Sequence, residues 1–187
     1  MIKIKLPALL RVRRTPAGYL KTALLICCCL PVWAQAAEQG EVVRVWDGDT
    51  VHIRDAGGRR RKIRLADIDA PEINQAEGRA CRDRLASHLL HHPVRFEVVA
   101  QDRYGREVAR IWHNGADANL RQLAEGCAWH DRRRAARRQP PGQYARYAAA
   151  EREARWRRNG LWQRPRPQAP WQYRRRQAQR RAHDSVP

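Results

Sequence analysis

The sequence predicts an α+β fold: a five-stranded OB-fold β-barrel with about three helices. Five short segments alternate apolar and polar residues, as strands do, and glycine or aspartate punctuates them. Three of these segments come before residue 70 and two come after residue 93, and a helical pattern separates the two groups. Small Greek-key barrels of the OB type have this arrangement of strands and helices.

The first group of strands is a three-stranded meander. Its strands span residues 41–46, 50–54 and 61–68 (EVVRVW, TVHIR and RKIRLADI). If the second turn is centred between Gly57 and Gly58, antiparallel pairing places Asp49 roughly opposite Ala66. Asp69 then lies about 10 Å farther along the strand, so we expect both carboxylates at one end of the same sheet.

The remaining elements follow in the order helix, two strands and two helices. They span residues 77–91, 94–102, 107–114, 117–126 and 142–160. Apolar residues recur at helical spacing in the first helix, Asp117 is placed to cap the second, and Gly160 ends the third. Residues 37–162 are therefore expected to form one domain. Residues 163–187 are rich in proline and then in arginine without an apolar period, which predicts a disordered tail.

The first 36 residues differ from the rest of the chain. They contain six basic residues, no acidic residue and the apolar run TALLICCCLPVWA. A basic start, a short apolar core and small residues at Ala34 and Ala36 are typical of a secretory signal peptide. We therefore expect residues 1–36 to be removed and the protein to be periplasmic or secreted. The alternative is an N-terminal segment that is retained as an anchor.

The chain is strongly basic, with 38 basic and 19 acidic residues. Its net charge falls from +19 to +13 without the first 36 residues, and Lys62 is the only lysine that then remains. Planar arginine side chains bind phosphate oxygens in pairs, which indicates a polyanionic partner. The alternative is an ordinary soluble surface that is rich in arginine, so the charge alone leaves the function open.

Two cysteines, Cys81 and Cys127, follow the predicted signal peptide. An even number of cysteines in an exported chain permits a disulfide, which we expect here; two buried reduced cysteines are the alternative. His88, His91 and His92 cluster at a helix end without cysteines or acids at zinc-site spacing. No zinc site is therefore predicted.

Five acidic residues gather in a short segment of this basic chain: Asp47, Asp49, Asp67, Asp69 and Glu72. An EF-hand calcium loop that starts at Asp47 would need glycine at residue 52 and glutamate at residue 58, where His52 and Gly58 stand. An EF-hand is therefore excluded. A hairpin turn at Asp47 with solvated acids at the strand ends is the remaining non-catalytic interpretation.

Arginines accompany these acids. Arg64 precedes Asp69 by five residues, and the turn-like sequence DRYGR supplies Arg103 and Arg106. Phosphodiester hydrolysis needs a hard cation, a base that activates water, and donors for the developing negative charge. Carboxylates and paired arginines supply these parts without a thiolate or imidazole ligand. The segment therefore favours a metal-assisted phosphodiesterase.

Four motifs occur in a fixed order: DGDTV, IRLADIDAPE, DRYGREVA and AEREARWRRNGLW. In order and spacing they resemble the staphylococcal nuclease (thermonuclease) family over residues 41–162. The resemblance implies an SNase-like OB-fold, Ca2+ as the cofactor, and an endonuclease that hydrolyses DNA and RNA and leaves 3′-phosphate ends. A non-catalytic OB-fold module that binds nucleic acid is the alternative. Such a module would be expected to lose the acids or arginines of the site, and this chain retains them.

The resemblance also assigns roles to residues. Asp49 and Asp69 would be the carboxylate ligands of calcium. Ala70, which stands where the staphylococcal enzyme has threonine, would contribute its backbone carbonyl. Glu72 would be the general base that orients or deprotonates the attacking water.

The resemblance also assigns residues to the binding of the phosphate and of the nucleotide. Arg64 and Arg106 would bind the phosphate and stabilise its transition state. Tyr104 matches an aromatic hydroxyl near the bound nucleotide, and Arg103 beside it is expected to contact the substrate. We expect DNA and RNA as substrates, no stable protein partner, a monomer, and no membrane contact once the signal peptide is removed.

Three features depart from the family pattern. The loop after Glu72 is shorter than in the staphylococcal enzyme. Residues 130–134 are HDRRR, where relatives have a tyrosine-containing stretch that helps to bind the nucleotide, and Trp129 is the substitute to consider for base stacking. Asp67 has no counterpart as a ligand; it either supports a neighbouring ligand or ends a strand.

Overall fold

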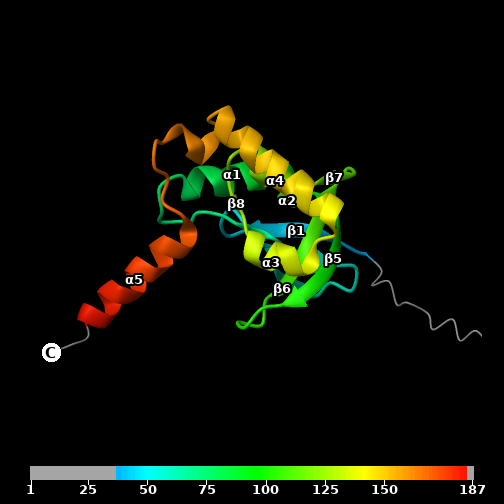
Figure 1. Cartoon of the computed structure of the whole chain (residues 1–187). Coiled ribbons are helices and arrows are strands. Elements are labelled where there is room, and N and C mark those ends of the chain that lie inside the picture. The colour runs from blue at the N-terminus through cyan, green and yellow to red at the C-terminus, as the bar shows by residue number, and fades with distance from the viewer. Residues whose placement is uncertain (1–36, 185–187) are drawn as a thin grey trace, which may run out of the picture. The chain divides into compact units, whose positions relative to one another are not determined.

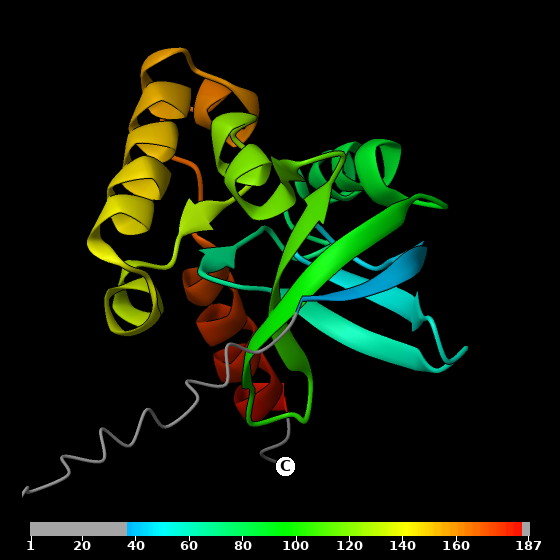
Figure 2. The same cartoon turned by 90° about the vertical axis from the view of Figure 1, so that its right-hand side faces the viewer.

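Five long strands close into a barrel, as the sequence predicts (Figure 1, Figure 2). The computed structural model describes residues 37–184. Its barrel strands are β1 (Glu38–Val45), β2 (Thr50–Asp55), β3 (Arg60–Leu65), β5 (Pro93–Gln101) and β6 (Glu107–His113). Neighbouring strands pair in the order β3-β2-β1-β5-β6, and parallel pairing of β3 with β6 closes the ring. The predicted α+β fold with a five-stranded OB-fold barrel is confirmed.

Burial alternates along the barrel strands. In β2 and β3, four side chains have no exposed surface: Val51, Ile53, Ile63 and Leu65. His52 and Arg64 lie between them and are only partly buried. Each buried aliphatic side chain contributes about 1.5–3 kcal/mol, and a slip of one residue would turn the whole set outward. The hydrophobic alternation therefore fixes the register, and with it the positions of residues at the strand ends.

Short strands hold the loop that follows β3. β4 (Ile68–Asp69) pairs antiparallel with β8 (Trp129–His130), and Asp69 lies opposite Trp129. β7 (Ala116–Asp117) pairs with the end of β6. Asp69 is thus fixed by strand pairing and does not lie in a free loop.

The three predicted helices are present. They are α1 (Gly78–Leu89), α2 (Ala118–Ala124) and α4 (Pro141–Trp156). The Asp117 side chain accepts a hydrogen bond from the Leu120 amide and so caps α2, as predicted. The buried Tyr147 of α4 donates its hydroxyl hydrogen bond to the same aspartate at 2.8 Å. α1 packs against β1, and α2 packs against both β6 and α4.

Three helical segments of the described part are absent from the sequence prediction. They are α3 (Arg132–Arg138), the 3-10 helix η1 (Gly160–Gln163) and α5 (Pro170–Asp184). α3 lies between the predicted helices at 117–126 and 142–160, where the sequence predicts no helix or strand, and the Asp131 side chain caps it by accepting a hydrogen bond from the Arg134 amide. The prediction of a disordered tail is wrong for α5. Ala169 and Pro170 are buried, and they anchor the start of this helix.

The two cysteines are free thiols, and both are buried. A hydrogen bond with Cys127, together with burial, raises the pKa of the Cys81 thiol. Cys81 belongs to α1 and Cys127 follows α2, so the pair lies between these two helices. The expected disulfide is not formed in the structure, and the alternative of two buried reduced cysteines is observed.

The predicted signal peptide, residues 1–36, lies outside the described residues. Among residues 37–184, no helix combines the length and the apolar character that crossing a membrane requires.

Candidate active site

The predicted carboxylates lie together at one end of the barrel. Asp49 comes just before β2, Asp69 lies in β4, and Glu72 lies in the loop that follows. The two aspartates are each 3% exposed, whereas the Glu72 side chain is 36% exposed. Thr50 lies opposite Arg64, one residue from the predicted register, and both aspartates stay at the same end.

Arg64 joins the two buried aspartates. Its Nη1 lies 2.6 Å from Asp49 Oδ1, and its Nη2 lies 2.8 Å from Asp69 Oδ1. Burial opposes the charged guanidinium, but the two carboxylates more than offset this effect and raise the pKa of Arg64. One largely buried cation, whose side chain is 12% exposed, therefore sits between two buried anions. The remaining negative charge favours a further cation at this point.

Asp49 is held in place by its neighbours. Its Oδ2 accepts a hydrogen bond from the Ala70 amide at 2.9 Å, and its Oδ1 accepts one from the Thr50 hydroxyl at 3.0 Å. Asp47 Oδ1 accepts a hydrogen bond from the Asp49 amide at 3.0 Å, which is typical of a turn residue. Burial and the neighbouring Asp49 raise the pKa of Asp47 to about 7. The effect of Asp49 reflects the concentration of carboxylates at this end of the barrel.

The turn between β5 and β6 places Arg106 next to the same site. Asp102 accepts hydrogen bonds from the Arg106 Nε at 2.7 Å and from its amide at 3.0 Å. The Arg106 Nη1 lies 3.5 Å from the Thr50 hydroxyl, which itself bonds to Asp49. Gly105 in this turn has a φ of 75°, a value that glycine adopts without strain. Asp102, which sequence reasoning did not single out, therefore orients Arg106.

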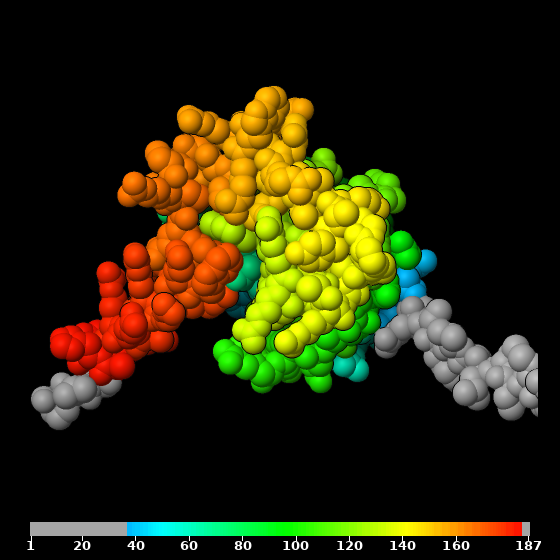
Figure 3. Space-filling model, viewed as in Figure 1, coloured from blue at the N-terminus to red at the C-terminus, as the bar shows by residue number. Residues whose placement is uncertain are grey.

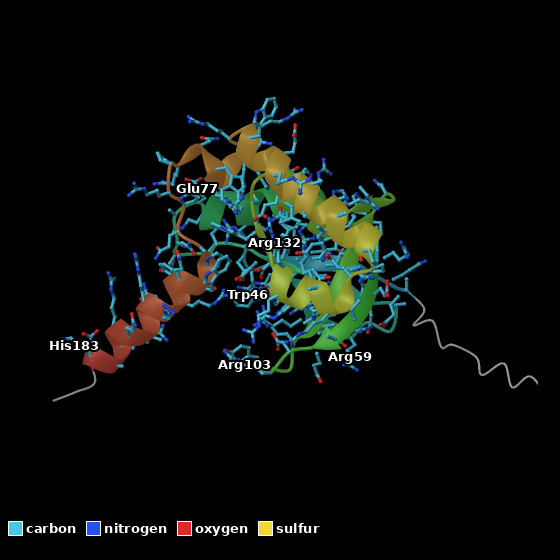
Figure 4. The ribbon with its side chains drawn as sticks, viewed as in Figure 1. Trp46, Arg59, Glu77, Arg103, Arg132 and His183 are labelled. Atoms are coloured by element: carbon cyan, nitrogen blue, oxygen red, sulfur yellow. The ribbon has the colours of Figure 1, made fainter. Side chains whose placement is uncertain are left out.

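Tyr104 and Arg103 occupy the tip of this turn. Tyr104 is 68% exposed, and its hydroxyl accepts a hydrogen bond from the Arg103 Nη2 at 2.6 Å. Figure 4 shows Arg103 on the turn. Their exposure leaves both side chains accessible to a bound nucleotide.

A single cleft of about 1030 Å³ unites these side chains. Most of the predicted site residues line it: Asp49, Arg64, Ala70, Glu72, Arg103, Tyr104 and Arg106. Asp69 adjoins the cleft through Arg64. Figure 3 shows a hollow in the same region, between the orange-red C-terminal segment and the yellow-green surface of residues near 130. The structure thus brings together the residues that the resemblance assigns to metal, water and phosphate.

Asp67 supports α3. It is 2% exposed and lies 3.0 Å from the Arg138 Nη2. Its carbonyl also accepts a hydrogen bond from the Asp131 amide, at the start of α3. Arg134 and Arg138 of α3 line the cleft, and sequence reasoning missed both. The signal that was available is Asp131, a capping residue in front of an alanine-containing segment.

Trp129 does not replace the missing tyrosine. It is 6% exposed, because its ring packs edge-on against Trp162 at 5.1 Å and Trp171 at 6.1 Å between centroids. A base cannot stack on an indole that is covered in this way. The residue contributes to the packing that holds α5.

α5 brings an arginine that sequence reasoning also missed. The Arg174 Nη2 lies 2.8 Å from Asp69 Oδ2, and its Nη1 lies 2.7 Å from Glu72 Oε1. Burial opposes its charge, but hydrogen bonds to Asp69 and then to Glu72 raise the pKa of Arg174. No local pattern indicated this contact, because Arg174 is 102 residues from Glu72 in the sequence.

The donors at this site fit a hard cation. The carboxylates of Asp49 and Asp69 and the Ala70 carbonyl are all oxygen donors, and calcium takes about six to eight of them. Among residues 37–184, no group of three or more His, Cys, Asp or Glu side chains could hold a metal ion. The chain would therefore supply two carboxylates and one carbonyl, and water and phosphate oxygens would complete the shell.

Fold and site together define a class: OB-fold proteins with a thermonuclease-type site of carboxylates and arginines. A family model described as staphylococcal nuclease homologue matches residues 62–164, more than half of the chain. The chain belongs to the staphylococcal nuclease family, and the resemblance seen in the sequence is confirmed.

Several relatives match nearly the whole chain. A micrococcal nuclease of Shigella flexneri is 36% identical over 162 residues, which are 82% of this chain and 88% of that protein. Protein ParB of Escherichia coli is 34% identical over 160 residues, 81% of this chain and 86% of that protein. An uncharacterized endonuclease of Haemophilus influenzae is 31% identical over 168 residues, 88% of this chain and 89% of that protein.

Proposed function

We propose that the protein is an exported, calcium-dependent endonuclease that hydrolyses DNA and RNA and leaves 3′-phosphate ends. As a member of its family, it is a hydrolase of the thermonuclease type that acts on nucleic acid. The observation that carries the finer proposal is the combination, at one cleft, of the buried Asp49 and the adjoining buried Asp69 with a water-accessible glutamate and two arginines. Arg64 lies between Asp49 and Asp69 there and forms an ion pair with each.

Calcium would be held by Asp49, Asp69 and the Ala70 carbonyl, where it would offset the charge of the scissile phosphate. Glu72 is the base because its side chain is 36% exposed to water, whereas Asp49 and Asp69 are each 3% exposed. It accepts a proton from the water whose oxygen attacks phosphorus. The bond between phosphorus and the 5′ oxygen breaks, that oxygen gains a proton, and the phosphate stays on the 3′ side.

Arg106 and Arg64 act on the phosphate. Arg106 is pre-oriented by Asp102, so its outer nitrogens are available for the oxygens that gain charge in the transition state. Arg64 is already committed to the two aspartates. It therefore holds the carboxylates in place and contributes its positive charge at short range.

The second candidate is an OB-fold module that binds nucleic acid without cleaving it. That candidate explains the basic charge and the arginine-lined cleft. It gives no role to Asp49, Asp69 and Glu72, whose like charges would weaken the binding of a polyanion. The nuclease is therefore favoured.

Export is proposed from the sequence of residues 1–36, which has the parts of a signal peptide. The mature chain would begin near residue 37 and act as a monomer, with nucleic acid as its partner and no stable protein partner.

The experiment uses the protein recovered from the periplasm or the medium, whose mass shows where the mature chain starts. It is incubated in calcium with 5′-labelled DNA and RNA strands of equal sequence, and the product ends are then probed with a 3′-phosphatase. We expect a start near residue 37, cleavage of both strands, and products whose migration changes after phosphatase treatment. Tight binding without cleavage would support the second candidate, and 3′-hydroxyl ends would contradict the proposed bond scission.

A further inference from the structure

α5 is a helix without an apolar face. It carries five arginines in its fifteen residues, and its only acidic residue is Asp184 at the end. Only Pro170, its first residue, is buried. A helix in a globular protein is normally held by an apolar stripe, which α5 lacks. Its arginines therefore form a basic surface that suits a partner with the opposite charge.

The start of α5 is fixed to the domain. Trp171 packs edge-on against the buried Trp129, with 6.1 Å between the ring centroids. The Tyr173 hydroxyl donates a hydrogen bond to the Asn74 carbonyl at 3.4 Å, and the Gln75 side chain donates one to the Gln168 carbonyl. These contacts set the direction in which the helix leaves the domain (Figure 1).

One face of α5 lines the cleft that contains the carboxylates. Arg174, Arg175 and Ala178 belong to this face, and Arg174 reaches Asp69 and Glu72. With 3.6 residues per turn, Arg176 and Arg180 point to the opposite side of the helix. The helix therefore has a cleft face with Arg174 and Arg175 and an outer face with Arg176 and Arg180. The fifth arginine, Arg181, lies two turns beyond Arg174 on the same side, near the end of the helix.

The cleft has basic residues on its other sides as well. The β5–β6 turn contributes Arg103 and Arg106, and α3 contributes Arg134 and Arg138. In Figure 4, Arg103 marks this turn and His183 marks the far end of α5. Arginines line several sides of the cleft, and the carboxylates lie between them. This arrangement suits the phosphodiester backbone of a nucleic acid that passes over a cation, because successive phosphates of one strand can each meet arginines on a different side.

We propose that α5 is a second nucleic-acid-binding wall of the cleft, in which Arg174 and Arg175 bind backbone phosphates next to the scissile one. This inference rests on the proposed nuclease function and adds the residues that hold the strand. Without substrate, Arg174 neutralises Asp69 and Glu72. With a strand and a cation bound, the cation faces Asp69, and Arg174 pairs with a phosphate of the strand.

The test compares two double variants of the full chain that remove equal charge from opposite faces of α5. Arg174→Ala/Arg175→Ala alters the cleft face, and Arg176→Ala/Arg180→Ala alters the outer face. Both are made in a Glu72→Gln background, so that the strand stays intact. Binding of a fluorescent single-stranded 12-mer is measured by anisotropy in calcium between 50 and 200 mM salt, and thermal melting checks the fold.

Each lost phosphate contact lowers the salt slope of single-strand binding by about 0.7. We expect the cleft-face variant to lose about 1.4 from the slope, which corresponds to binding weaker by about 25-fold at 0.1 M salt. The outer-face variant is expected to bind like the parent. Equal slopes for the two variants would overturn the proposal, whether both match the parent or both fall below it.

Cleavage by the wild-type chain is measured in parallel. If the wild type cleaves the strand and the two double variants bind it equally, α5 is not a binding wall but the nuclease function stands. If the wild type does not cleave, the nuclease function is wrong. The difference between the two faces then still decides whether α5 binds the strand.

Discussion

Glu72→Gln is expected to lower turnover on DNA by about 10²–10⁴-fold, because the amide cannot accept the proton of the attacking water. Glutamine has nearly the same shape, so substrate binding should be retained. The substitution also removes the ion pair between Glu72 and Arg174, and this pair is partly exposed. Such pairs contribute about 0–1 kcal/mol, so the melting temperature should change little. Turnover is measured at saturating DNA, together with a thermal melt.

The matched control is Glu77→Gln. Glu77 lies just before α1 and pairs with Arg164 at 3.1 Å, outside the cleft. This change removes the same charge and should leave turnover unchanged. Normal turnover of Glu72→Gln would show that another group activates the water, and equal losses in both variants would point to a general effect of charge.

Arg106→Ala is expected to lower turnover by about 10²–10³-fold through the loss of a preoriented donor to the transition state. Arg106 is a better choice for this test than Arg64, because its partner Asp102 lies in a turn near solvent and can be hydrated when the arginine is removed. Removing Arg64 instead would leave the buried Asp49 without its counterion, which costs about 3–5 kcal/mol of stability. Single-turnover rates and the affinity for DNA are measured separately.

Arg95→Ala is the control for Arg106→Ala. Arg95 lies on β5 over the ring of Trp112, away from the cleft, and its removal takes away the same charge from the same pair of strands. We expect its turnover to be normal. If Arg106→Ala weakened DNA binding but left the single-turnover rate intact, Arg106 would bind substrate without stabilising the transition state.

Much of the barrel and of the site was predictable because local patterns carry it. Alternating apolar residues in β2 and β3 fix which residues face inward, and so place Asp49 and Asp69 at one end. The predicted register was wrong by one residue, because the turn is centred on Gly57, with Arg54 opposite Arg60, and not between Gly57 and Gly58. Helix caps were predicted in part. Asp117 was recognised as the cap of α2, whereas Asp131, which caps α3, was not recognised.

The rest depends on contacts between distant residues that leave no local pattern. Asp67 and Arg138 are 71 residues apart, and their pairing explains an acid that had no assigned role. The helix α5 lacks an apolar period, so its sequence resembles a disordered tail. Burial of Trp129 under Trp162 and Trp171 also follows only from the folded chain, and it removes a candidate for base stacking.

The central claim is that a cation held by Asp49 and Asp69 is required for cleavage. The most direct measurement incubates the purified protein with supercoiled plasmid DNA in calcium, in a chelator, and in the chelator followed by excess calcium. We expect nicked and linear DNA in calcium, intact plasmid in the chelator, and restored cleavage when calcium is returned. Cleavage that continues at the same rate in the chelator would contradict the metal-assisted mechanism.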